Sequence, residues 1–98
     1  MRSIAEWQKA FKTAADQRFP DSGWGESERV QSIQEQLDDV KAALAVEHGT
    51  LQSADHAHQD PNHRIGALIA DILILAEERG FDAENELEKV LAWFEKRN

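Results

Sequence analysis

The chain has no cysteine, no long apolar run and a shortage of cations. Without cysteine it can form neither a disulfide framework nor a zinc ribbon. No run of apolar residues approaches the roughly 20 that are needed to cross a bilayer, and the N-terminus lacks the apolar core of a signal peptide. We therefore expect a cytoplasmic protein that makes no use of a membrane.

The deficit of positive charge bears on the partners of the protein. Lys and Arg number 11 against 19 Asp and Glu, which gives a net charge of −8. Binding of polymeric nucleic acid depends on clustered Lys and Arg, so the composition opposes it. An acidic surplus is compatible with a site for Mg²⁺, which prefers oxygen ligands. A protein of this charge would need such a metal to hold a phosphorylated ligand.

Strand-like alternation, internal repeats and glycine-rich phosphate loops are also absent from the sequence. The 98 residues are 41% apolar and 31% charged, which is typical of a folded globular chain with one modest core. We expect a single all-α domain over residues 1–98.

Capping signals divide the chain into four helices. Ser3 and Glu6 form a capping-box pattern, and Asp60 before Pro61 is a typical helix start. Gly49 and Gly80 are candidate helix ends. The predicted helices span about residues 3–17, 27–47 and 61–79, with a fourth that starts after an N-cap at Asp82.

Apolar residues recur at helical spacing in each segment, and we expect these stripes to face the core. The third helix is apolar on nearly every side, which four short helices cannot bury alone. A four-helix bundle that completes its core by oligomerisation, with this helix near the interface, is therefore predicted. The stripes are Val30, Ile33, Leu37, Val40 and Leu44; then Ile65, Ile69, Ile72 and Ala76; then Leu87, Val90, Leu91 and Phe94.

Asp71 is the one ionisable residue in the apolar run 66–76. Burying an unpaired carboxylate costs several kcal/mol, so a partner is expected. One interpretation is a divalent metal that Asp71 shares with acidic residues of the preceding helix. The other is that Asp71 faces a wet edge of the protein or an arginine.

Acidic residues on the second helix supply the other candidate metal ligands. Glu35 and Asp39 are four residues apart, so their carboxylates share one helix face, with Gln36 beside them. A cation between them would turn repulsion into attraction. The alternative is a solvated acidic face.

Three further features have a structural and a functional interpretation. Trp24 lies among turn-forming residues and is either a lid over the core or a platform for a nucleobase. Lys89 and Lys96 suit the C-terminal end of a helix, or they contact phosphate. The polar segment around His56, His58 and His63 is a connection, unless its histidines bind a metal.

The order of these parts resembles the MazG-like all-α nucleoside triphosphate pyrophosphohydrolases. That family carries a Glu-Glu-x-x-Glu-Leu motif on one helix and a Glu-Leu-x-Asp motif on the next. Here 33–40 (IQEQLDDV) stands at the first motif, and 68–73 (LIADIL) at the second. The stretch 76–82 (AEERGFD) is similar to the turn before the family's last helix.

The resemblance implies roles for individual residues. Glu35, Asp39 and Asp71 match motif carboxylates, which implies metal binding and catalysis. Gln36 stands where the family has Glu and would be a neutral ligand, while Leu68 replaces another motif Glu. The implied metal is Mg²⁺, or Mn²⁺. The implied substrate contacts are the aromatic residues Trp7 and Trp24 and the lysines Lys89 and Lys96, and Trp93 replaces a family Asn.

The activity that the resemblance implies is Mg²⁺-dependent hydrolysis of a nucleoside triphosphate to its monophosphate and pyrophosphate, in nucleotide-pool housecleaning. A homodimer or homotetramer is implied as well. Because two motif carboxylates are replaced, a second interpretation is a catalytically lapsed relative that serves as a binding or assembly module. A third is an unrelated helical domain.

Overall fold

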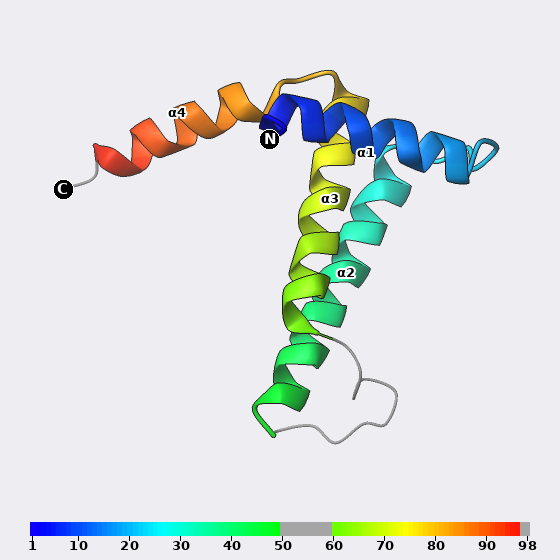
Figure 1. Ribbon diagram of the computed structural model, residues 1–98, viewed down its shortest axis with the longest axis vertical. Helices are drawn as coiled ribbons and strands as arrows, with labels where there is room; N and C mark the ends of the chain where they lie inside the picture. The colour runs from blue at the N-terminus through cyan, green and yellow to red at the C-terminus, as the bar shows by residue number, and fades with distance from the viewer. Residues whose placement is uncertain (50–59, 97–98) are drawn as a thin grey trace. The chain divides into compact units, whose positions relative to one another are not determined.

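The computed structural model describes residues 1–49 and 60–96, which form four α-helices and no strand (Figure 1). These helices are α1 (Ile4–Arg18), α2 (Glu26–Glu47), α3 (Pro61–Arg79) and α4 (Ala83–Glu95). The prediction of an all-α protein is confirmed for this part of the chain. None of these helices has the length and apolarity that spanning a membrane requires. The predicted connection with His56 and His58 lies outside the described residues.

Side-chain caps begin three of the helices where the sequence predicted them. Ser3 Oγ accepts a hydrogen bond from the Glu6 amide at 3.1 Å, and the Glu6 carboxylate accepts one from the Ser3 amide at 2.9 Å. Asp60 and Asp82 each accept a bond from the amide two residues further on, at 3.0 Å. These bonds satisfy amides that a helix start leaves without partners.

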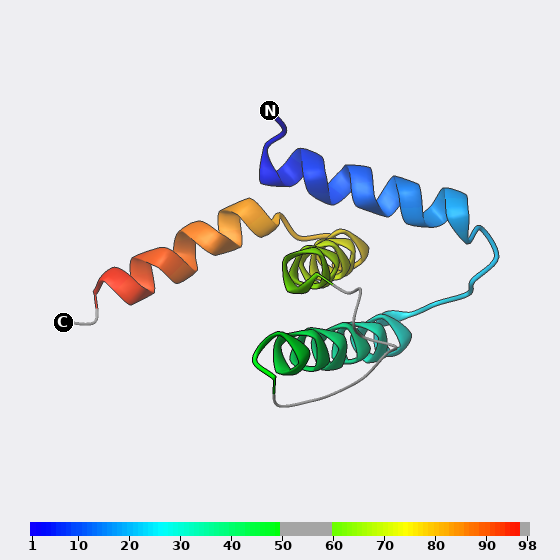
Figure 2. The same cartoon turned by 60° about the horizontal axis from the view of Figure 1, so that its bottom comes forward.

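The described residues group into two compact units that share α3. The first unit comprises residues 1–23 and 73–98, and the second comprises 24–72. The first therefore holds α1, the end of α3 and α4, while the second holds α2 and most of α3 (Figure 2). The single domain over residues 1–98 stays a prediction.

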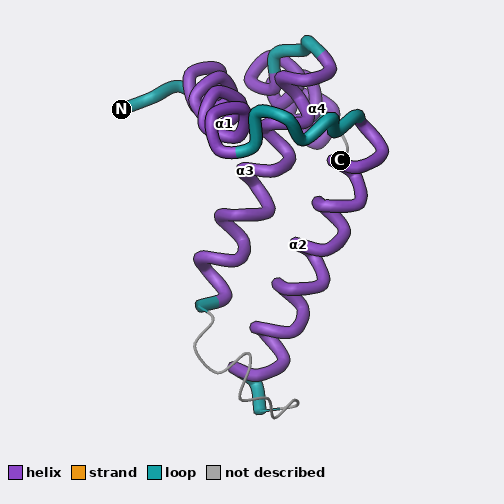
Figure 3. The backbone as a smooth tube through the Cα atoms, turned by 90° about the vertical axis from the view of Figure 1, so that its right-hand side faces the viewer, coloured by secondary structure: helices purple, strands orange, loops and turns teal. Residues whose placement is uncertain are grey.

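In the second unit, α2 and the first part of α3 run side by side in opposite directions (Figure 3). Two Arg–Asp pairs join them. Arg29 near the start of α2 pairs with Asp71 late in this part of α3, and Asp39 further along α2 pairs with Arg64 near the start of α3. Val40, which follows Asp39 on α2, is buried.

The predicted apolar stripes of α2 and α3 are only partly buried: Val40 and Ala76 lie in the core, but other members are exposed. Val30 is 53% exposed and Ile69 52% exposed, and Leu37, Ile65 and Ile72 are exposed as well. Hydrogen bonds explain the exposed residues. Asp71 bonds to Arg29 and Ser32 of α2, so the helix faces that carry these groups turn toward each other. Val30 follows Arg29 and Ile72 follows Asp71, so each lies about 100° around its helix from the bonded residue and is turned outward.

The turn from α3 to α4 organises the first unit. Gly80 has a positive φ of 76°, its amide donates to the Glu77 carbonyl, and the Phe81 amide donates to the Ala76 carbonyl, both at 3.1 Å. This is the Schellman pattern that ends a helix on a left-handed residue. It confirms the predicted helix end and sets the direction in which the chain enters α4.

Candidate functional site

Asp71 is buried in α3, as its apolar surroundings predicted, with 5% of its surface exposed. Its Oδ1 accepts a hydrogen bond from Arg29 Nη1 at 2.7 Å, and its Oδ2 accepts one from Ser32 Oγ at 2.6 Å. Each carboxylate oxygen thus has a partner on α2. Asp71 therefore faces an arginine, which was the second of its two interpretations.

Arg29 is held on two sides. Only 12% of its side chain is exposed, and its guanidinium carbon lies 4.9 Å from the centre of the Trp24 ring. A guanidinium above an indole face is a favourable cation–π arrangement. Trp24 therefore contributes to the placement of the cation that neutralises Asp71.

Gln36 follows Ser32 by one turn and lies on the same face of α2. Its Oε1 is buried and accepts no hydrogen bond within the described part of the chain. Buried polar atoms nearly always have a partner, so this oxygen marks an incompletely satisfied place in the site.

A shallow hollow of about 290 Å³ opens along the first turns of α2. It brings together two residues that the sequence singled out, Trp24 and Glu35. Hydrogen bonds from the Ser27 hydroxyl and the Gly25 amide lower the pKa of Glu28 in its wall, so that wall stays anionic. The hollow is lined by Trp24, Ser27, Glu28, Gln31, Ser32 and Glu35.

Two of the predicted metal ligands, Asp39 and Asp71, pair with arginines in the structure. Asp39 Oδ2 lies 3.5 Å from Arg64 Nη1, and Asp71 is bound by Arg29. Within residues 1–49 and 60–96, no three His, Asp or Glu side chains come together as a metal site would require. The metal site and its Mg²⁺ stay predictions.

The remaining predicted contacts belong to the first unit. Trp7 stacks on Phe11, with ring centres 5.6 Å apart. Lys89 Nζ lies 3.1 Å from the Glu86 carboxylate, and the backbone of Lys96 caps α4. The roles of Trp7, Lys89 and Lys96 as substrate contacts stay predictions.

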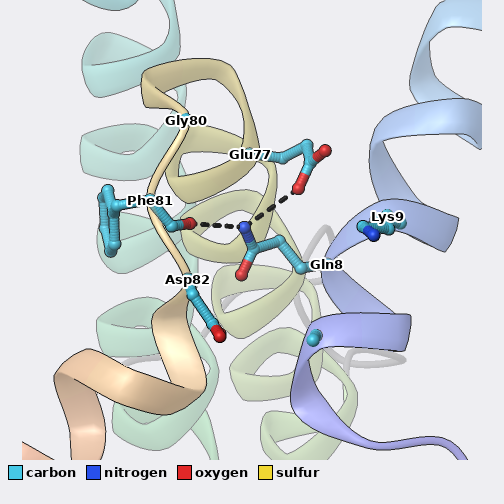
Figure 4. A pocket seen from close by; sticks show the side chains of 7 residues that line it. Gln8, Lys9, Glu77, Gly80, Phe81 and Asp82 are labelled. Atoms are coloured by element: carbon cyan, nitrogen blue, oxygen red, sulfur yellow. Dashed lines mark hydrogen bonds between the residues drawn. The ribbon is translucent and has the colours of Figure 1, made fainter.

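Sequence reasoning missed Gln8, a buried amide in the first unit. Its Nε2 donates to the Phe81 carbonyl at 2.7 Å and to Glu77 Oε1 at 3.0 Å (Figure 4), and its Oε1 accepts from the Ala83 amide at 3.1 Å. Gln8 thereby ties α1 to the turn between α3 and α4, beside a hollow of about 260 Å³. Its role is to hold this turn.

Arg29 and Ser32 were missed as well. Their signal in the sequence was their spacing, because residues 29, 32 and 36 place three polar groups on one face of α2.

Comparison of the chain with family models, with curated proteins and with solved structures found no match in any of the three. The MazG-like resemblance therefore continues as a proposal.

Proposed function

We propose that the chain is a catalytically lapsed MazG-like helical domain that works as a binding or assembly module. The observation that carries the proposal is the Arg29–Asp71 pair. In the family, a divalent cation balances the carboxylate at this position. Here a guanidinium from α2 stands at 2.7 Å from the same carboxylate and supplies the balancing charge.

Electrostatics explain why one cation disfavours the other. A divalent ion at Asp71 would meet the positive charge of Arg29 at close range, in a setting where only 12% of the arginine side chain reaches water. Repulsion between like charges grows as the local dielectric falls. Neutral Gln36 and apolar Leu68 add no negative charge that would offset it.

Assembly is supported by the apolar surface. Large apolar side chains are exposed on α2, α3 and α4, and in the described part of the chain the buried apolar residues are few: Val40, Ala43, Ile74 and Ala76. Exposed apolar surface of this extent is typical of proteins that associate. We propose a homodimer or homotetramer.

Calorimetric titration with MgCl₂ and MnCl₂ tests the lapsed state, with and without a non-hydrolysable nucleoside triphosphate. The wild type should give no metal-binding heat that nucleotide strengthens. Asp71→Asn and its control Asp38→Asn, an exposed carboxylate on α2, should then behave alike. Metal binding that Asp71→Asn abolishes and Asp38→Asn retains would overturn the proposal.

A second candidate is the pyrophosphohydrolase activity itself, with Mg²⁺ as cofactor and a nucleoside triphosphate as substrate. The hollow favours it, because Trp24 offers an aromatic face for a base beside the carboxylate of Glu35. Pyrophosphate release from a panel of nucleoside triphosphates, with Mg²⁺ or Mn²⁺, decides between the candidates. Release that Asp71→Asn abolishes supports the enzyme, and no release on any substrate supports the lapsed module.

A further inference from the structure

No residue of α4 is buried, although the helix carries four large apolar side chains on one side. Leu87, Val90, Leu91 and Phe94 recur at the spacing of one helix face and are between 46% and 61% exposed. A helix of 13 residues is marginal in water unless its apolar face packs against something. These four residues, the α4 stripe, therefore need another surface to pack against.

We propose that the α4 stripe is the docking surface for a second copy of this chain, with the two α4 helices packed in opposite directions. The inference rests on the assembly role in the proposed function and names the surface that performs it. It does not depend on whether catalysis survives.

The spacing of the stripe is self-complementary. Its members are separated by three, one and three residues, so the pattern is the same in both directions along the helix. An antiparallel pair related by a two-fold axis sets Leu87 opposite the partner's Phe94 and Val90 opposite the partner's Leu91. Each large side chain then meets a large apolar one, as an isologous interface requires.

The charges of α4 also favour an antiparallel pair. Its first half carries the carboxylates Glu84, Glu86 and Glu88, whereas after its middle residue, Lys89, it carries a single carboxylate, Glu95, before the C-cap Lys96. A parallel pair would bring the two acidic ends together. An antiparallel pair sets each acidic end beside the partner's lysine-bearing end, and it also opposes the two helix dipoles.

Sedimentation equilibrium of the full chain tests the surface with two adjacent substitutions. Leu91→Glu puts a charge in the α4 stripe, while Ala92→Glu puts the same charge on the opposite side of the helix. We expect the wild type and Ala92→Glu to sediment as a dimer or larger, and Leu91→Glu to sediment with a smaller mass. A monomeric wild type, or an unchanged mass for Leu91→Glu, would overturn the proposal.

Disulfide cross-linking tests the direction and remains decisive if Leu91→Glu unfolds. The chain has no cysteine of its own, so single substitutions report cleanly. In the antiparallel pair, two copies of residue 87 are offset by seven residues, or about 10 Å along the axis, beyond the Cα separation that a disulfide allows. A mixture of Leu87→Cys and Phe94→Cys chains should cross-link to a heterodimer under mild oxidation.

Failure of the heterodimer to form, or efficient cross-linking of Leu87→Cys to itself, would overturn the antiparallel interface. These readouts are separate from pyrophosphate release. A chain that hydrolyses nucleotides and pairs through the α4 stripe would overturn the lapsed function and leave the interface standing. A chain that shows no activity, and whose mass is unchanged by Leu91→Glu, would overturn the interface and leave the lapsed function standing.

Discussion

Arg29 Nη1 lies 2.7 Å from Asp71 Oδ1, across the boundary between α2 and α3. The side chains are 12% and 7% exposed, so neither charge has much water to replace its partner. A buried pair of this kind adds little net stability compared with well-packed apolar residues, but breaking it leaves an uncompensated charge. The pair therefore fixes how α2 is turned against α3.

Removing Arg29 alone should be costly. Arg29→Met keeps an apolar stem and deletes the cation, which leaves the Asp71 carboxyl group buried without its partner. We expect the free energy of unfolding to fall by about 3 to 5 kcal/mol, measured by urea denaturation followed by circular dichroism. Adding Asp71→Leu to this variant should restore most of the loss, because the unpaired carboxyl group is then gone.

Arg64→Met is the matched control. Arg64 and Asp39 also join α3 to α2, but they are 3.5 Å apart, with side chains 28% and 42% exposed. Exposed pairs contribute about 0 to 1 kcal/mol, so this change should be small. Equal losses for Arg29→Met and Arg64→Met would show that burial does not set the cost.

The sequence was sufficient for the helix starts and for the burial of Asp71. Local patterns determine these features, because a cap depends on neighbouring residues and burial depends on a continuous apolar run. The sequence did not identify the partner of Asp71, because Arg29 is 42 positions away and lies between a glutamate and a valine. The rotation of α2 that brings them together is a property of helix packing, and it also turned Val30 outward.

In the candidate site, too, local arrangements could be predicted from the sequence and long-range contacts could not. Trp24 and Glu35 meet at one hollow because the turn before α2 and its first turns follow each other directly along the chain. The buried Gln8 gave no signal, since its partners Phe81 and Ala83 are more than 70 positions away. Polar contacts of that range depend on the tertiary packing of α1.

Gln8→Ala should destabilise the first unit. The substitution leaves the part-buried Phe81 carbonyl and Ala83 amide without their partner, and an orphaned polar group costs about 1 to 3 kcal/mol where it is buried. We expect a loss of about 2 to 4 kcal/mol, with faster hydrogen exchange at the Ala83 amide. Gln17→Ala, an exposed glutamine on the same helix, should change stability by less than about 0.5 kcal/mol. Unaltered exchange at Ala83 would contradict the role of Gln8.

Acid should loosen the start of α1 through Glu6. Hydrogen bonds with the Ser3 amide and hydroxyl lower the pKa of the Glu6 carboxyl. A lowered pKa means that the contribution to stability is present above the unfolded-state pKa of about 4.3, and is lost as the pH falls through the folded-state pKa. Melting temperatures recorded from neutral pH into acid should therefore fall more steeply for the wild type than for Glu6→Gln. Parallel curves would contradict this prediction.

Two glycines at α3 should respond to alanine in opposite directions. Neither has an atom that would clash with an added Cβ within 4 Å, so the backbone alone decides. Gly80 has a φ of 76°, where alanine is strained, and Gly80→Ala should cost about 1 kcal/mol. Gly66 lies within α3, where alanine is preferred, and Gly66→Ala should gain about 0.5 to 1 kcal/mol. Both are measured by thermal denaturation; a Gly80→Ala variant as stable as the wild type would mean that the turn into α4 does not need its left-handed residue.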